Sequence, residues 1–131
     1  MNKRIALATV AVFFTWTVLD FVIHGLILAA TYRETAQLWR PMGEMKMEVM
    51  YGAVLVAAFV FVFIYARLVG AKSLTRGLYF GTLWGIGVGV GMGYGTYAVM
   101  PIPYALALTW FLGTVAEGAA AGFIAGTIIK H

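Results

Sequence analysis

The chain has 131 residues, of which 63% are hydrophobic and 11% charged, and its formal net charge is +4. A soluble domain carries roughly a quarter of its residues charged, so this composition indicates a protein of the lipid bilayer. The absence of cysteine excludes disulfides, thiolate catalysis and cysteine-ligated metals. The basic residues are scattered along the chain and form no nucleic-acid-binding patch, so no nucleic-acid partner is expected.

Four apolar segments predict four membrane-spanning helices, at about residues 5–30, 44–66, 74–100 and 104–129. About 20 helical residues cross a hydrocarbon core of ~30 Å, and lipid offers the backbone no other way to satisfy its hydrogen bonds. The predicted fold class is therefore an all-α integral membrane protein. We expect a single transmembrane domain over residues 1–131, built as a four-transmembrane-helix bundle.

The connection between the first two segments combines apolar and charged residues. Leu38 and Trp39 stand there beside charged residues, which is typical of a short interfacial segment at the lipid headgroups. Pro41 fits the first turn of the second helix, where its missing N–H costs nothing. Glu44 would then lie near the positive end of that helix dipole. The second helix is therefore expected to begin outside the hydrocarbon.

Basic residues predict the orientation of the spans, because cytoplasmic loops are enriched in lysine and arginine. Six of them fall on one predicted side of the membrane and three on the other. The first group is Lys3, Arg4, Arg67, Lys72, Arg76 and Lys130, and the second is Arg33, Arg40 and Lys46. The asymmetry predicts an N-in/C-in, multi-pass protein of a bacterial-type inner membrane.

Glycines recur at four-residue spacing in the last two spans. Such spacing lets helix backbones approach closely, which is a common way for membrane helices to associate. The residues assigned to packing are Gly85, Gly89 and Gly93 in the third span and Gly118 and Gly122 in the fourth. A second row, Gly87, Gly91 and Gly95, predicts that the third span contacts helices on two sides. A glycine-lined pore or channel is the alternative.

Asp20, His24 and Glu117 lie inside otherwise apolar spans. An ionisable residue in the bilayer costs on the order of 3 kcal/mol and is rarely left without a partner. Asp20 and His24 are four residues apart and share a helix face. Together with Glu117 they predict a metal or proton site in the outer half of the membrane. Three more residues are assigned to its outer mouth: Glu44, Met45 and Glu48.

Three chemical roles remain open for this group. Imidazole with carboxylates suits a divalent transition metal, and nearby methionines could deliver copper. Chains of Asp, Glu and His also form proton or cation relays in transporters. In the third role, the polar residues only hold helices together. The methionines near the predicted mouth are Met42, Met45, Met47 and Met50. They add little support to a copper role, because methionine is common filler in protein cores.

The sequence as a whole favours a small, non-enzymatic membrane component that binds or passes a cation. Its expected partners are the lipid bilayer and either further copies of the chain or a larger membrane complex. A purely structural subunit or assembly factor is the alternative. A membrane enzyme ranks third, because no residue pattern specifies a substrate.

Overall fold

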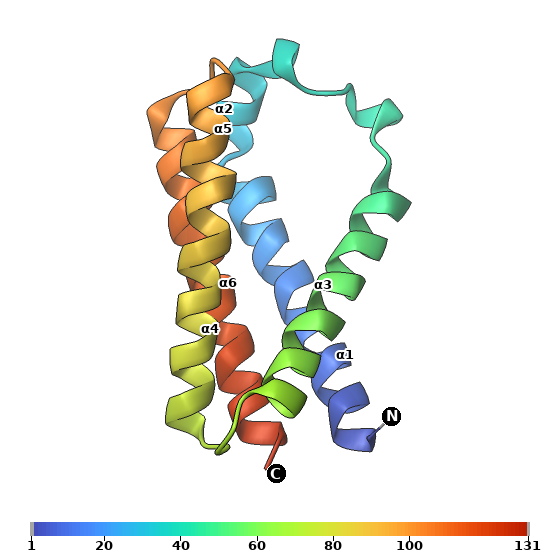
Figure 1. Cartoon of the computed structure of the whole chain (residues 1–131). Helices are drawn as coiled ribbons and strands as arrows, with labels where there is room; N and C mark the ends of the chain where they lie inside the picture. The colour runs from blue at the N-terminus through green and yellow to red at the C-terminus, as the bar shows by residue number, and fades with distance from the viewer. Residues whose placement is uncertain (1, 131) are drawn as a thin grey trace.

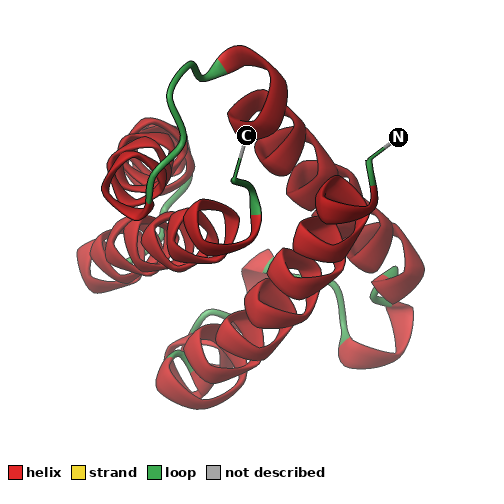
Figure 2. Ribbon diagram, turned by 90° about the horizontal axis from the view of Figure 1, so that it is seen from below, coloured by secondary structure: helices red, strands yellow, loops and turns green. Residues whose placement is uncertain are grey.

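The computed structural model describes residues 2–130, and every regular element in that range is helical. The helices α1 (Lys3–Asp20), α2 (Ala29–Glu34), α3 (Met47–Leu68), α4 (Leu74–Gly89), α5 (Thr96–Val99) and α6 (Tyr104–Ile128) are joined by shorter helical pieces. Two of these are π-helices, η1 (Phe21–Ile27) and η4 (Val90–Gly95), and two are 3₁₀ turns, η2 (Ala36–Leu38) and η3 (Met42–Glu44). Figure 2 shows the helices and their connecting loops from below.

Three helices are long and apolar enough to cross a membrane: Lys3–Ile27, Met47–Leu68 and Tyr104–Ile128. The chain is therefore a helical protein with three candidate membrane spans. The region between residues 74 and 99 is also helical throughout, but it is divided between α4, η4 and α5.

Both ends of the described chain lie at the same end of the bundle (Figure 1). A hydrogen bond joins them there, because Arg4 Nη1 donates to the carbonyl oxygen of Ile128 at 2.8 Å. We call this the proximal end, and the opposite end, which carries the α2–α3 connection, the distal end.

The closest packing in the molecule lies between α4 and α6, which run side by side in Figure 1. Gly77, Gly81, Gly85, Gly89 and Gly93 face α6, and Gly118 and Gly122 face α4. A methyl group added at Gly85 would lie 2.7 Å from the carbonyl oxygen of Thr114, and one at Gly81 would overlap the carbonyl oxygen of Gly118. We call this contact the glycine seam. All five glycines assigned to packing from the sequence are buried in it.

The second glycine row was predicted to contact another helix, and within one chain it does not. A Cβ built at Gly87, Gly91 or Gly95 meets nothing within 4 Å. This face of α4 and η4 is therefore open in the single chain, because α6 covers only the first row.

Helix α3 packs against the bundle mainly through its proximal half, with Val54 and Ala57 adding partly buried contacts. Its buried residues are Ala58, Phe61, Val62 and Tyr65, and residues 47–57 contribute none. Phe61 packs edge-on against Trp16 of α1 and Trp84 of α4, with ring centroids 5.8 and 5.3 Å apart. In Figure 1 the distal half of α3 leans away from the other helices.

The start of α3 also differs from the prediction made for Pro41. The helix begins at Met47, and Pro41 precedes the separate 3₁₀ turn η3, which contains Glu44. The carbonyl oxygen of Pro41 accepts the N–H of Glu44 at 2.9 Å, so the proline initiates a turn and not the helix. Glu48, not Glu44, is the acidic residue in the first turn of α3.

Candidate functional site

The polar residues of the first span lie where the helix changes type. α1 ends at Asp20, and the π-helix η1, which contains His24, follows without interruption. A π-helix has a wider turn, so it shifts His24 around the axis relative to a regular α-helix. Such segments are rare and are often found at functional sites.

Asp20 and Glu117 form a carboxyl pair between α1 and α6. Their side chains are near neighbours, and both are half-buried. An ionised carboxylate can only accept hydrogen bonds, so two neighbouring carboxyls can bond each other only when at least one of them carries a proton.

Trp16 ties the two helices together at the same level. Its indole Nε1–H donates to the backbone carbonyl oxygen of Glu117 at 2.8 Å, and its side chain is only 7% exposed. A glycine of α6, Gly113, leaves room for the first span close to this contact. A Cβ at Gly113 would lie 2.9 Å from Ile23 Cδ1.

His24 takes part in a second polar group, on the distal side of the carboxyl pair. Tyr32 Oη lies 2.6 Å from His24 Nδ1 and accepts the Trp110 Nε1–H at 2.7 Å. Because an indole N–H can only donate, the Tyr32 hydroxyl is free to donate to His24 Nδ1. Neutral His24 would then carry its proton on Nε2. Asp20 acts electrostatically on both His24 and Tyr32, so the two groups are coupled.

Aromatic packing fixes Tyr32 in place. Trp39 packs edge-on against Tyr32 and Trp110, with ring centroids 5.6 and 6.0 Å apart. Its Nε1–H donates to Thr35 Oγ1 at 2.9 Å, and Thr35 is 7% exposed. Burial raises the pKa of the Tyr32 phenol, and the negative charge of Asp20 adds to this, while the hydrogen bond from Trp110 works in the opposite direction. Tyr32 therefore remains a neutral hydrogen-bond donor at physiological pH.

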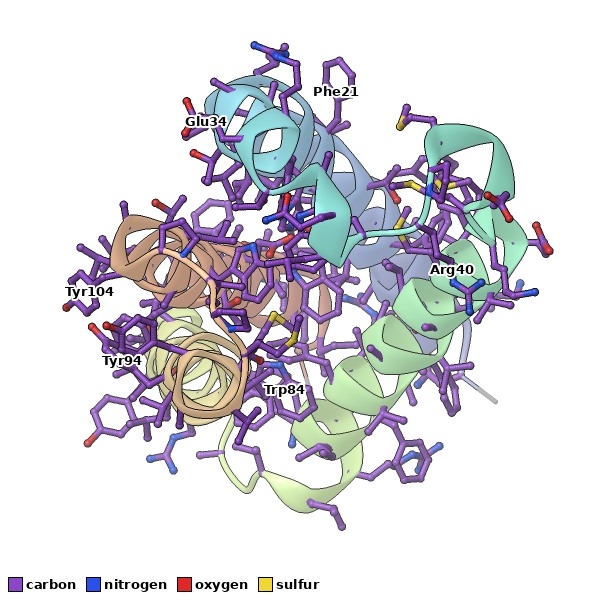
Figure 3. The ribbon with its side chains drawn as sticks, turned by 90° about the horizontal axis from the view of Figure 1, so that it is seen from above. Phe21, Glu34, Arg40, Trp84, Tyr94 and Tyr104 are labelled. Atoms are coloured by element: carbon purple, nitrogen blue, oxygen red, sulfur yellow. The ribbon has the colours of Figure 1, made fainter. Side chains whose placement is uncertain are left out.

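The residues predicted for the outer mouth lie on the surface of the distal connection. Glu44, Met45 and Glu48 are all exposed, on η3 and at the start of α3. Figure 3 views this distal end from above, with Arg40 labelled on the same connection. Among the described residues neither Glu44 nor Glu48 hydrogen-bonds His24, and their part in the site stays a prediction.

Among residues 2–130, no three His, Cys, Asp or Glu side chains come close enough together to hold a metal ion. His24 Nδ1 is engaged by Tyr32, and Asp20 is directed to Glu117. The hydroxyls nearby are also occupied, because Thr17 and Thr114 donate to the backbone carbonyls of Phe13 and Trp110. The donor set fits a proton better than a chelated metal.

Sequence reasoning missed Trp16, Tyr32 and Trp110 as members of the site. A signal for two of them was present, because Trp16 lies four residues before Asp20, and Tyr32 eight residues after His24, both spacings that share a helix face. For Trp110 the signal was only general, because any buried indole N–H usually has a hydrogen-bond partner.

Comparison of the chain with known protein families, curated proteins and solved structures gives no match.

Proposed function

We propose that this protein is a small proton-binding component of a bacterial-type inner membrane. The carboxyl pair Asp20–Glu117 is the proposed binding site. The observation that supports this most is that two half-buried carboxyl groups are neighbours inside candidate spans, since two such groups can share one proton. Stated more broadly, we propose that the site binds or passes a cation, of which a proton is the best-supported case.

The proposed architecture is a bundle of four transmembrane helices, with α4, η4 and α5 together forming the third span in chain order. Both termini would be cytoplasmic, and the distal end, with its short interfacial segment, would face outward. Two observations support this. Residues 74–99 are helical throughout, and the two described chain ends lie at one end of the bundle. The six basic residues that mark the cytoplasmic side in the sequence belong to that end.

Proton access is proposed from the distal side only. Tyr32 and His24 lie between the distal end and the carboxyl pair and offer a stepwise polar route. On the proximal side, the core is an apolar cluster that includes Ile5, Val12 and Val62, all at most 2% exposed. A site with one open side binds and releases a proton. Transfer across the membrane would need a second conformation.

The protein is further proposed to act as a homo-oligomer or as a subunit of a membrane complex. The open row of Gly87, Gly91 and Gly95 supports this, because close helix contact through glycine is a common mode of membrane association. The row has no neighbour within the described chain.

Carbodiimide labelling tests the proton site. Dicyclohexylcarbodiimide reacts with protonated carboxyls in apolar surroundings, so we expect it to label Asp20 or Glu117, with labelling that falls as the pH rises. Asp20→Asn and Glu117→Gln should remove the label, whereas Glu48→Gln, at an exposed glutamate, should not. If neither carboxyl reacts at any pH while the reagent labels a control membrane carboxyl, the proposal fails.

The alternative function is structural: a subunit or assembly factor whose polar residues only hold helices together. The Trp16–Glu117 hydrogen bond favours it, because this contact joins α1 to α6 without any ion. Asp20→Asn separates the two functions, since it keeps hydrogen bonding and removes the titratable group. It should leave a structural subunit fully active, but abolish a proton-dependent activity in a folded protein.

A metal is the remaining cation to be tested. Elemental analysis of purified wild type beside His24→Ala decides it. A stoichiometric metal that disappears in the variant would replace the proton in this proposal. We expect no such metal, because the described residues do not gather three ligands.

A further inference from the structure

A hollow opens at the distal end of the molecule, between the α2–α3 connection and the first turn of α3. Its volume is about 370 Å³, within the range of about 300–1,000 Å³ typical of ligand sites. The walls are apolar and are formed by Leu38, Trp39, Met45, Met47 and Met50. The remaining lining residues, Arg40 and Lys46, are both cations.

One wall of this hollow is rigid and the other is adaptable. Trp39 is fixed by its hydrogen bond to Thr35 and by its packing on Tyr32 and Trp110. The methionines opposite have long, unbranched side chains that fill irregular space. A flexible chain can therefore lie between them without a set shape.

The hollow adjoins an apolar surface that runs toward the middle of the candidate span. Residues 47–57 of α3 contribute no buried side chain, and Leu55 and Val56 are 46% and 63% exposed. In Figure 1 the distal end of α3 stands clear of α1 and α6. An amphiphile held in the hollow would find its tail already directed along a lipid-exposed helix.

Charge selects the headgroup. Arg40 and Lys46 line the hollow, whereas the acidic residues of the same segment, Glu44 and Glu48, do not. Cations at the height of the headgroups attract anionic lipids, and an arginine can hold a phosphate with two parallel hydrogen bonds. A zwitterionic headgroup also carries a phosphate, but its own cation competes with Arg40 and Lys46 for that phosphate and adds a positive charge beside them.

We propose that this hollow binds one anionic phospholipid of the leaflet at the distal end. Its phosphate lies between Arg40 and Lys46, and its acyl chain runs past Trp39 and Met50 along α3. This inference depends on the membrane location of the chain and not on the Asp20–Glu117 pair.

Native mass spectrometry of the full chain in detergent, with phosphatidylglycerol or phosphatidylcholine added, tests the site. Wild type should retain one phosphatidylglycerol and release phosphatidylcholine. Each near-surface cation contributes a factor of roughly five, so Arg40→Gln with Lys46→Gln should weaken retention by about tenfold to thirtyfold. The matched control is Arg33→Gln with Arg76→Gln, which removes the same charge from exposed positions elsewhere.

Two further measurements locate the lipid. A photoactivatable phosphatidylglycerol should crosslink to residues 38–50 in wild type, and Met50→Ala should reduce this crosslinking while leaving the charge unchanged. Inorganic phosphate should not displace the lipid, because it has no tail to fill the apolar walls. Equal loss in the two double variants, equal retention of both lipids, or crosslinks only outside 38–50 would overturn the proposal.

Discussion

Trp16 on α1 donates its indole N–H to the backbone carbonyl oxygen of Glu117 on α6, at 2.8 Å. The partner is the main chain of Glu117 and not its carboxyl group, so the side chain stays available to Asp20. This contact sets α1 and α6 at a fixed relative depth. The Asp20–Glu117 pair depends on that depth, because a helix shifted by one turn would move either carboxyl by about 5.4 Å.

Replacing Trp16 should therefore loosen the Asp20–Glu117 pair without altering either carboxyl group. Trp16→Phe keeps an aromatic ring against Phe61 but removes the hydrogen bond, which should lower the free energy of unfolding by about 1 kcal/mol. Denaturation in mixed micelles measures this. Trp84→Phe serves as the control, since Trp84 also packs against Phe61. An equal loss in the control would assign the effect to ring size alone.

Alanine substitutions should cost much more stability at glycines in the seam than at glycines on the open face of the same helix. At Gly81 even an alanine Cβ would overlap the backbone oxygen of Gly118, so Gly81→Ala should destabilise by about 1–3 kcal/mol or more. Gly87→Ala, on the open face, should be neutral or stabilise by up to about 1 kcal/mol, because alanine favours helix. Unfolding of both variants in micelles is the measurement. Similar values for the two would contradict the seam.

The same open face gives a prediction about assembly. If Gly87, Gly91 and Gly95 contact another copy or subunit, then Gly91→Leu should lower the oligomeric mass in mild detergent and leave the fold unchanged. Light scattering measures the mass, and circular dichroism checks the helix content. A wild-type protein that is a stable monomer under these conditions would remove the basis for a homo-oligomer.

Tyr32 predicts a pH dependence at the alkaline end. Burial raises the pKa of its phenol, whose ordinary value is about 10, so the fold favours the neutral form. The stabilisation is complete below the ordinary pKa and is lost as the pH rises through the higher, folded value. Stability should fall above about pH 10, and less steeply in Tyr32→Phe. Tyr51→Phe, at a tyrosine 43% exposed, should follow wild type.

The orientation can be tested with reporter fusions. A fusion at His131 should report the cytoplasm, and an insertion within residues 36–40 should report the outer side, because positively charged segments are retained inside. A periplasmic signal at His131 would invert the molecule and place the Asp20–Glu117 pair nearest to the cytoplasm.

The helical class was readable from the sequence because hydropathy alone requires it. A run such as residues 104–128 has too few polar groups to be stable in water, and lipid leaves helix as its natural conformation. The start of α3 was not readable to the same degree. Pro41 is acceptable both in the first turn of a helix and before a 3₁₀ turn, and only the surrounding structure selects the second.

The candidate site was partly predictable for a similar reason. Asp20, His24 and Glu117 were conspicuous because charge is costly in apolar surroundings. Their partners were harder to find, since Tyr32 and Trp110 are ordinary residues near a membrane surface. The π-helix at Phe21–Ile27 has no signature in the sequence, although it changes the direction in which His24 projects. The position of α3 depends on long-range packing, so the exposure of Glu48 could not be foreseen.

The glycine seam has a consequence for inheritance. Every amino acid except glycine carries a Cβ, so no missense mutation at the codons of Gly77, Gly81, Gly118 or Gly122 avoids the overlap with the facing backbone. Natural selection should keep glycine at these four positions in any lineage that retains the protein, whichever synonymous codon is used. The glycines of the open row lie in the same helical stretch and have room for a Cβ: Gly87, Gly91 and Gly95. Substitutions should therefore accumulate there first, unless a partner covers this face.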